Sequence, residues 1–297
     1  MKEYFGGVEA GGTKIVCAIA NNPEDILAIE RFPTTSPDET IRKIIQFFTE
    51  NVKKRDINIK AIGIGSFGPI DLNIQSAKYG FITTTPKKGW GNTDIIRPIR
   101  DSLNVPVFFD TDVNAAALGE GKWGAAQQIK NFLYFTIGTG IGGGAIINGK
   151  PLHGLVHPEM GHIRLNQDTL VDPYQGKCPY HHNCFEGLAS GPAMEERWQK
   201  KAFELDSNHP GWELEADYIA QAMSNFVCCF SPEKIILGGG VMQQLHLFPM
   251  IRKKTQKYLN NYIQAEAITI NIDQFIVPPG LGNLSGILGA IALAMSK

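Results

Sequence analysis

The chain has 297 residues, more than one hydrophobic core usually serves, so two domains of ordinary size are expected. Hydrophobic residues make up 43% of the chain and charged residues 19%, which is typical of a globular protein with a sizeable core. The net charge of −1 supplies no basic surface for a phosphate backbone and argues against nucleic acid as a partner.

Neither a membrane span nor a secretory signal is indicated. No apolar run approaches the ~20 residues that a membrane-spanning helix needs. The opening MKEYFGGVEAGG lacks the apolar core of a secretory signal, because glycines and a glutamate follow at once. These features argue against a membrane partner and predict a cytoplasmic protein.

The first half of the chain alternates between strands and helices. YFGGVEA (4–10) and KIVCAIA (14–20) predict two strands around a glycine turn, and ILAIERFPT (26–34) predicts a third. Residues 39–55 have apolar side chains at helical spacing, namely Ile41, Ile44, Ile45, Phe48 and Val52. KAIGIGSFG (60–68) and VPVFFD (105–110) predict buried strands, and a helix is expected from about 113 to 121.

The pattern restarts near the middle of the chain. FLYFTIGTGIGGGAIING (132–149) again predicts strand, glycine turn and strand. Helices are expected at 192–205 and 215–230, a strand at KIILGGG (234–240), and a small-residue helix at 284–297. Two halves that each open with a glycine-cornered hairpin predict duplicated α/β domains, with a cleft between them as a natural small-molecule site.

We expect the first domain to span 1–118, with the last helix packed back on it, and the second to span 119–297 with an inserted loop at 157–184. The chain has five cysteines, an odd number that does not suggest a disulfide framework. Cys17, Cys228 and Cys229 lie within apolar stretches and are expected to be buried small hydrophobic residues.

Glycine-rich segments raise the question of nucleotide binding. GIGSFG (63–68) and GTGIGG (138–143) match G-x-G-x-x-G, but Pro69 follows the first and a strand follows the second. A dinucleotide fold needs a helix there, so that interpretation is disfavoured, and no Walker motif is present.

EAGGTK (9–14) and GTGIGGG (138–144) each lie at a predicted hairpin corner. Their backbone N–H groups, with Thr13, Lys14 and Thr139, could bind an anion. Either corner alone is an ordinary turn. The pair, in equivalent places of a repeated domain, favours a polyphosphate held from both sides.

FFDTDVNAAALGEG (108–121) places Asp110 and Asp112 between a strand and a helix. A lone aspartate there is commonly a helix N-cap. The functional alternative is a base that accepts the proton of a substrate hydroxyl as the hydroxyl attacks phosphorus. A helix N-terminus would keep that carboxylate ionised at neutral pH.

The motifs EAGGTK, TDVNAAALGEG, GTGIGGG, HPEMGH, GKCPYHHNC, FEGLASGPA and LGGGV occur in one order along the chain. That order resembles the ROK family of sugar kinases and repressors, within the actin-like, ribonuclease H-like ATPase fold, over essentially the whole chain. TTTPKKGWGNTDI (83–95) and GKCPYHHNCFEGLASGPA (176–193) look most like the ROK fructokinases.

The resemblance implies ATP-dependent phosphorylation of a hexose 6-hydroxyl, with Mg²⁺ on the phosphates, in a homodimer. D-fructose is the favoured acceptor, and mannose, glucose or an N-acetylhexosamine are the alternatives. Asp112 would be the base, and sugar contacts would come from Asn114, Glu159, His162 and Glu186. ATP would be lined by Gly11, Gly12, Thr13, Lys14, Thr139, Gly140, Ser190, Gly191, Pro192, Gly238, Gly239 and Gly240.

This chain departs from the family pattern at three places. Glu9 stands where the family often has aspartate, which bears on metal or phosphate geometry. Thr111 precedes the base where glucose kinases tend to carry asparagine, and this argues against strict glucose selectivity. The common cluster C-x-C-G-x-x-G-C is replaced by C-P-Y-H-H-N-C.

The altered cluster still offers four ligands, His162, Cys178, His181 and Cys184, a Cys₂His₂ set suited to tetrahedral Zn²⁺. His181 is chosen over His182 because the resemblance puts a ligand three residues after the first cysteine. Four protein ligands leave no position for water, so the zinc would be structural. His153 and His157 have no assigned role.

Two other classes of function compete with a kinase. A sugar-sensing repressor on the same scaffold would carry a helix-turn-helix ahead of the first hairpin, which begins at about Tyr4. A zinc hydrolase would lose activity at once with a chelator, whereas a kinase with structural zinc would only be destabilised.

Overall fold

The computed structural model describes residues 2–296 and divides into two compact units. Unit 1 contains the chain up to Gln128, the segment Pro151–Pro158, and the chain from Gly280 on. Unit 2 contains Ile129–Lys150 and Glu159–Pro279. Among the helices of residues 2–296, none is both long and apolar enough to cross a membrane.

Unit 1 is built on a five-stranded sheet in the order β3-β2-β1-β4-β7. Its strands are β1 (Tyr4–Ala10), β2 (Lys14–Asn22), β3 (Asp25–Pro33), β4 (Ile59–Ser66) and β7 (Val107–Thr111). The first three are antiparallel neighbours, whereas β1, β4 and β7 run parallel. Ala10 therefore pairs with Ser66 and Ser66 with Thr111, so three strands end at one edge of the sheet.

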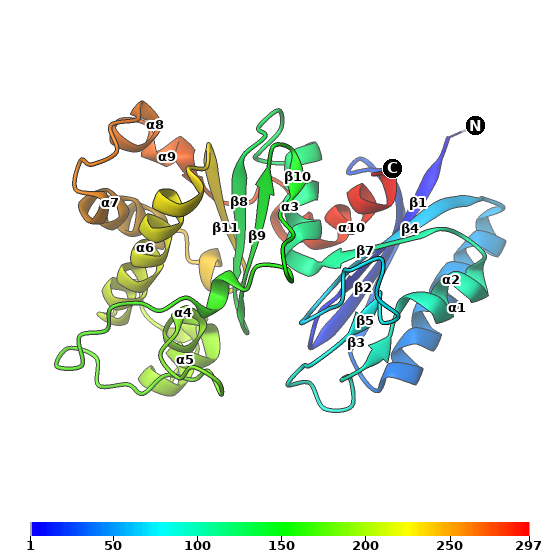
Figure 1. Ribbon diagram of the computed structural model, residues 1–297, viewed down its shortest axis with the longest axis horizontal. Coiled ribbons are helices and arrows are strands. Elements are labelled where there is room, and N and C mark those ends of the chain that lie inside the picture. The colour runs from blue at the N-terminus through cyan, green and yellow to red at the C-terminus, as the bar shows by residue number, and fades with distance from the viewer. Residues whose placement is uncertain (1, 297) are drawn as a thin grey trace. The chain divides into compact units, whose positions relative to one another are not determined.

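Helices cover both faces of this sheet (Figure 1). They are α1 (Pro37–Arg55), α2 (Ile96–Leu103), α3 (Asp112–Trp123) and α10 (Ser285–Met295), beside a small β5 (Phe81–Ile82) and β6 (Thr93–Asp94) hairpin. Helix α10 packs on β1, β4 and α3. Glycine permits this approach, because a Cβ at Gly63 would lie 2.0 Å from the carbonyl oxygen of Ala290.

Unit 2 repeats the plan, with sheet order β10-β9-β8-β11-β12. The strands are β8 (Phe132–Ile137), β9 (Ile141–Ile147), β10 (Lys150–Pro151), β11 (Lys234–Gly238) and β12 (Ile276–Val277). The β8–β9 hairpin lies beside parallel β11, as β1–β2 lies beside parallel β4. The expected duplicated α/β fold is confirmed.

The helices of unit 2 are α4 (Phe185–Ala189), α5 (Gly191–Trp198), α6 (Gly211–Phe230), α7 (Leu247–Leu259), α8 (Glu266–Thr269) and α9 (Ile272–Phe275). The helix expected at 192–205 ends early, because Gln199 adopts a left-handed conformation with φ of 55°. Only a short 3₁₀ turn, Ala202–Glu204, follows.

Three cysteines that lie in apolar stretches were expected to be buried, and of these only Cys17 is buried. Cys228 and Cys229 are exposed on α6. The buried face of that helix presents Phe226 and Val227, and Cys228, about 200° around the helix from Phe226, turns towards solvent. Cys229 is exposed beside the last residue of the helix, Phe230.

Within unit 1, Glu120 joins α3 to the segment that precedes α10. Its fully buried carboxylate accepts hydrogen bonds from the backbone N–H groups of Ala125 (2.8 Å), Gly280 (2.9 Å) and Leu281 (3.0 Å). It also accepts one from the hydroxyl of Ser285 (2.7 Å). Four donors compensate the charge, and the chain on both sides of unit 2 is held in unit 1.

Candidate functional site

The β1–β2 corner of unit 1 is a fixed turn with an exposed tip. Gly11 N donates to Lys14 O (3.0 Å), and Thr34 holds the corner by donating from Oγ1 to Gly11 O (2.7 Å) and from N to Thr13 O (3.0 Å). Gly12, Thr13 and Lys14 are exposed. A backbone anchored behind the tip leaves the Thr13 hydroxyl and the Lys14 ammonium group able to meet an anion.

Asp112 lies at the same edge of the sheet, as the first residue of α3. The N-cap of α3 is Thr111, whose Oγ1 accepts a hydrogen bond from Asn114 N at 3.1 Å. The alternative of an aspartate N-cap is therefore wrong for both Asp110 and Asp112. Val113 N donates to Oδ1 of Asp112 at 2.9 Å, which orients this half-buried carboxylate at the helix start.

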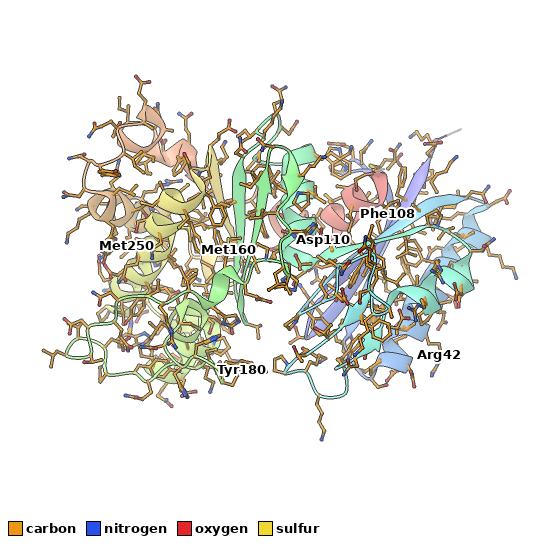
Figure 2. All side chains as sticks on the ribbon, in the orientation of Figure 1. Arg42, Phe108, Asp110, Met160, Tyr180 and Met250 are labelled. Carbon is orange, nitrogen blue, oxygen red and sulfur yellow. The ribbon has the colours of Figure 1, made fainter. Side chains whose placement is uncertain are left out.

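A buried cluster surrounds the residue two positions before Asp112. Asp110, labelled in Figure 2, accepts hydrogen bonds at Oδ1 from Thr111 N (2.7 Å) and from Nδ2 of Asn114 (2.8 Å). Its Oδ2 lies 2.9 Å from Nε2 of His153. This hydrogen bond to Asp110 raises the pKa of His153, and the partial burial of the ring opposes it. Asn114, expected as a sugar ligand, thus uses its amide N–H to hold Asp110.

His153 and His157, which the sequence left without a role, lie in unit 1 and contact distant residues of the same unit. His157 is buried, and its Nε2 accepts a hydrogen bond from Ile70 N at 3.2 Å. His153 contacts a residue 43 positions away. No spacing rule in the sequence relates residues so far apart, and so these contacts were not predicted.

Glu9 occupies a different environment from the exposed corner that follows it. Burial raises the pKa of its carboxyl group, and the charges of Lys14 and Arg31 oppose that shift. A Cβ at Gly286 would lie 2.5 Å from the Glu9 carboxyl carbon, so the side chain packs against the first turn of α10.

Three of the motifs expected to line ATP meet in unit 2. Gly191 N donates to Gly138 O at 2.7 Å, and a Cβ on Gly138 would lie 3.5 Å from Gly240 N. The β8–β9 turn, the start of α5 and the loop after β11 are therefore adjacent. Gly239 has φ of +92°, and a Cβ there would come within 2.5 Å of Ile137 N, so only glycine fits.

Glu186 on α4 supports the same turn. Its Oε2 accepts a hydrogen bond from Ile141 N at 2.9 Å, and a Cβ on Gly140 would lie 2.7 Å from that oxygen. The residue expected to bind sugar hydroxyls therefore also holds the glycine corner, a contact between residues 45 positions apart that no sequence pattern indicated.

The predicted metal ligands converge in unit 2, with the four ligand atoms of His162, Cys178, His181 and Cys184 within 4.8 Å of one another. Nδ1 of His162 lies 3.5 Å from Cys184 Sγ and 3.8 Å from Cys178 Sγ, and Nδ1 of His181 lies 3.7 Å from Cys178 Sγ. Ligands at ~2.0–2.3 Å around a tetrahedral Zn²⁺ would be separated by about 3.5 Å. The donor set and its spacing fit zinc.

Burial raises the pKa of Cys184 to about 11, against a hydrogen bond from the backbone of Gly187 that lowers it. Without a cation the thiol is therefore protonated at neutral pH. A divalent ion would displace that proton and stabilise the folded loop.

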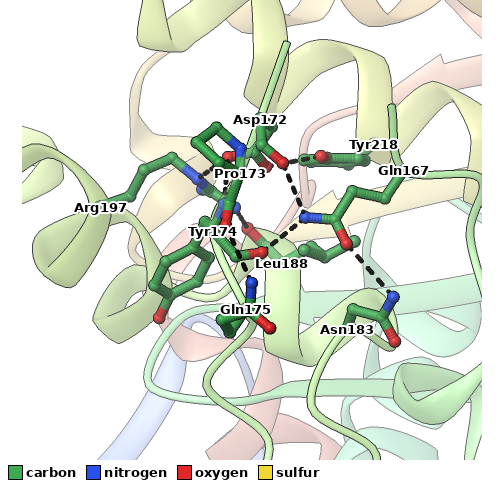
Figure 3. Close-up of polar contacts among 9 residues, drawn as sticks. All are labelled: Gln167, Asp172, Pro173, Tyr174, Gln175, Asn183, Leu188, Arg197 and Tyr218. Carbon is green, nitrogen blue, oxygen red and sulfur yellow. Dashed lines mark hydrogen bonds and ion pairs between the residues drawn. The ribbon is translucent and has the colours of Figure 1, made fainter. Parts of the chain in front are cut away.

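A polar network fixes the loop that carries Cys178 and His181 (Figure 3). Buried Asp172 accepts hydrogen bonds from Arg197 Nε on α5 (3.1 Å) and from the hydroxyl of Tyr218 on α6 (2.6 Å). Gln167 Nε2 donates to the carbonyl oxygen of Asp172 (3.0 Å), and Asn183 Nδ2 donates to Gln167 Oε1 (3.2 Å). The loop is thus attached to both helices.

Glu159 and His162 share one turn, because His162 N donates to Glu159 O at 3.0 Å. Nδ1 of His162 faces Cys184, so Nε2 on the opposite edge of the ring points away from the cysteines. An ion bound to Nδ1 would fix this turn and leave Nε2 directed away from the metal site.

The expected site residues divide between the units. Unit 1 holds Gly11, Gly12, Thr13, Lys14, Asp112 and Asn114. Unit 2 holds Thr139, Gly140, Glu159, His162, Glu186, Ser190, Gly191, Pro192, Gly238, Gly239 and Gly240, with the metal ligands.

Known proteins resemble the chain over its whole length. A model described as the ROK family matches residues 5–297. The chain is 50% identical to a putative fructokinase of Bacillus subtilis (strain 168), covering 98% of this chain and 95% of that protein. It is 45% identical to a fructokinase of Pediococcus pentosaceus, covering 98% of each. A ROK hexokinase structure from Thermus thermophilus superposes with a TM-score of 0.78 at 26% identity, covering 98% of each chain.

Proposed function

This chain belongs to the ROK family, and we propose that it is a sugar kinase that transfers the γ-phosphoryl group of ATP to the 6-hydroxyl of D-fructose, giving fructose 6-phosphate. The full-length similarity to fructokinases carries the proposal. The position of Asp112, at the same sheet edge as the Thr13–Lys14 corner, supports it from the geometry.

Asp112 acts as the general base. The 6-hydroxyl oxygen attacks the γ-phosphorus, the bond to the bridging oxygen of ADP breaks, and the hydroxyl proton passes to the Asp112 carboxylate. The N–H of Val113 holds Oδ1 of that carboxylate in place. Because phosphoryl transfer depends chiefly on positioning and charge neutralisation, an oriented carboxylate is sufficient as the base.

We assign a phosphate-binding role to the glycine corner of each unit, and in unit 2 also to the motifs adjacent to that corner. In unit 1 the donors are the Thr13 hydroxyl and the Lys14 ammonium group, on a corner fixed by Thr34. In unit 2 the segments Gly138–Gly140, Ser190–Pro192 and Gly238–Gly240 are adjacent, because Gly191 N donates to Gly138 O. Gly138, Ser190 and Gly191 use their N–H groups within the protein, so we assign phosphate binding to the Thr139 hydroxyl and to the N–H groups of Gly140, Gly239 and Gly240. Mg²⁺ bound with the nucleotide would supply neutralisation of the phosphate charge.

Zn²⁺ is assigned to His162, Cys178, His181 and Cys184 as a structural ion. Four protein donors leave no coordination position for water, which argues against zinc hydrolase chemistry. The ion would fix His162 and, through the His162–Glu159 turn, the direction of the Glu159 side chain that we assign to the sugar.

Thr111 argues against strict glucose selectivity. It is buried, and its hydroxyl oxygen accepts the N-cap hydrogen bond, so position 111 supplies no side-chain amide for a sugar hydroxyl. We further assign the protein to the cytoplasm as a homodimer, by family resemblance. Mannose, glucose and N-acetylhexosamines remain the alternative acceptors.

The test is a coupled ADP-release assay with Mg-ATP across fructose, mannose, glucose and N-acetylhexosamines, with Asp112→Asn as the control. Fast turnover on fructose that the variant loses supports both the reaction and its base. Fastest turnover on another hexose would reassign the acceptor. Absence of turnover on every sugar would overturn the kinase proposal in favour of a binding protein on the same scaffold.

A further inference from the structure

His153 lies near the proposed base, but the proposed reaction gives it no role. It lies in Pro151–Pro158, a segment that belongs to unit 1 although its neighbours on both sides belong to unit 2. His157 in the same segment is buried, as expected of a structural anchor. The side chain of His153, by contrast, is 42% exposed.

The partner of this exposed ring is a buried carboxylate. The Asp110 side chain is only 4% exposed, and its oxygens meet Thr111 N, Nδ2 of Asn114 and Nε2 of His153. A purely structural buried pair in this chain looks different, since Arg197 and Asp172 are 6% and 3% exposed. A buried carboxylate that holds one nitrogen of an accessible imidazole is an arrangement that orients the ring for a ligand.

The contact with Asp110 also determines which nitrogen is presented. With Nε2 directed at the carboxylate, Nδ1 lies on the opposite edge of the ring. A protonated Nδ1 donates a hydrogen bond and a neutral one accepts it. A hydroxyl group can form a hydrogen bond with Nδ1 in either protonation state, because it both donates and accepts.

The ring lies beside residues on both sides of the base in the chain and is held through Asp110. Asp110 and Asn114 flank Asp112 in the chain, and Nδ2 of Asn114 lies 3.4 Å from Nε2 of His153. We propose that His153 contacts the acceptor sugar, bonding one of its hydroxyls through Nδ1, and that Asp110 is the positioning residue that aims the ring. This inference rests on the proposed function, with Asp112 as the base of a hexose kinase.

Two substitutions separate sugar contact from structural support. His153→Gln places an amide N–H where Nε2 was, so the bond to Asp110 is kept and the outward nitrogen is lost. His153→Ala removes both. We expect each variant to raise the KM for fructose about tenfold, which is the loss of one good hydrogen bond, with the KM for ATP within about twofold of wild type. At a pH above the raised pKa of His153, His153→Gln should also keep the wild-type melting temperature.

The matched control is His209→Gln in unit 2, where Nδ1 accepts a hydrogen bond from Gly211 N at 3.0 Å and the ring packs against Trp198. This variant should leave the KM for fructose unchanged. Wild-type protein that phosphorylates fructose, together with an unchanged KM in His153→Gln, would overturn the sugar contact and leave the proposed function standing. Wild-type protein that phosphorylates no sugar would overturn both.

The positioning role of Asp110 is tested by combining Asp110→Asn with His153→Ala. If Asp110 acts on the sugar through His153, the combined rise in KM for fructose will be smaller than the product of the two separate rises. Equality with that product would show that the two residues act independently and would overturn the positioning role.

Discussion

Replacing Glu120 with glutamine tests the junction that holds the chain on both sides of unit 2 in unit 1. The amide can keep one oxygen, and the least costly arrangement leaves it facing Ala125 N and Gly280 N. The NH₂ group then faces Ser285, whose hydroxyl can accept from it and still donate to Gly282 O, as it does at 2.9 Å. Leu281 N is left without an acceptor.

The cost follows from that count of contacts. One buried N–H without a partner costs about 1–3 kcal/mol, and two hydrogen bonds lose the strengthening effect of the charge. We therefore expect Glu120→Gln to lower the free energy of unfolding by about 2–4 kcal/mol. For a chain of this size the melting temperature should fall by roughly 5–10 °C.

Urea unfolding followed by circular dichroism, with differential scanning calorimetry, measures this loss. The matched control is Glu50→Gln on the exposed side of α1, where the carboxylate accepts a hydrogen bond from Gln46 Nε2 and substitution should change stability by less than about 0.5 kcal/mol. A Glu120→Gln protein as stable as Glu50→Gln would refute the assigned role of the buried carboxylate. A second variant tests the same arrangement. In a Ser285→Ala background, Glu120→Gln should lower the free energy of unfolding further, because the amide NH₂ group then has no hydroxyl to accept its hydrogen bond.

Three further outcomes are expected. Asp112→Asn should remain folded and bind ATP while kcat falls by about 10²–10⁴-fold, measured by ADP release, and near-normal turnover would reject it as the base. Cys178→Ser should lose bound zinc, measured by elemental analysis, and lower the melting temperature more than it lowers kcat; an equally stable zinc-free variant would contradict a structural metal. Because Asp110 raises the pKa of His153, their pair contributes stability that is complete below the ordinary histidine pKa of about 6.5 and declines as pH rises through the raised value. His153→Gln should abolish that decline in melting temperature, and an unchanged pH profile would argue against the pairing.

Several features of this protein could be predicted from residues that are close together in the sequence. Apolar runs and glycine corners predicted the β1–β2 and β8–β9 hairpins, and their repetition predicted the duplicated fold. Cys178, His181 and Cys184 lie within one short loop, so thiol and imidazole ligands at that spacing already indicated a metal cluster. These properties depend on residues close in sequence, where periodicity and ligand spacing act directly.

Other features depended on tertiary contacts. Cys228 and Cys229 are exposed although their stretch is apolar, and the N-cap of α3 is Thr111 where an aspartate was the common expectation. The pairing of His153 with Asp110 joins residues 43 positions apart.

The sequence by itself determined the strands, the repeat and the chemical character of the site, because these arise from local periodicity and residue type. Which carboxylate holds which donor was decided only by the tertiary structure. Glu120 meets Gly280 across 160 positions, and Glu186 meets Ile141 across 45. Such partners are selected by strand order and by the close approach of helices, and neither of these is encoded in the spacing of residues along the chain.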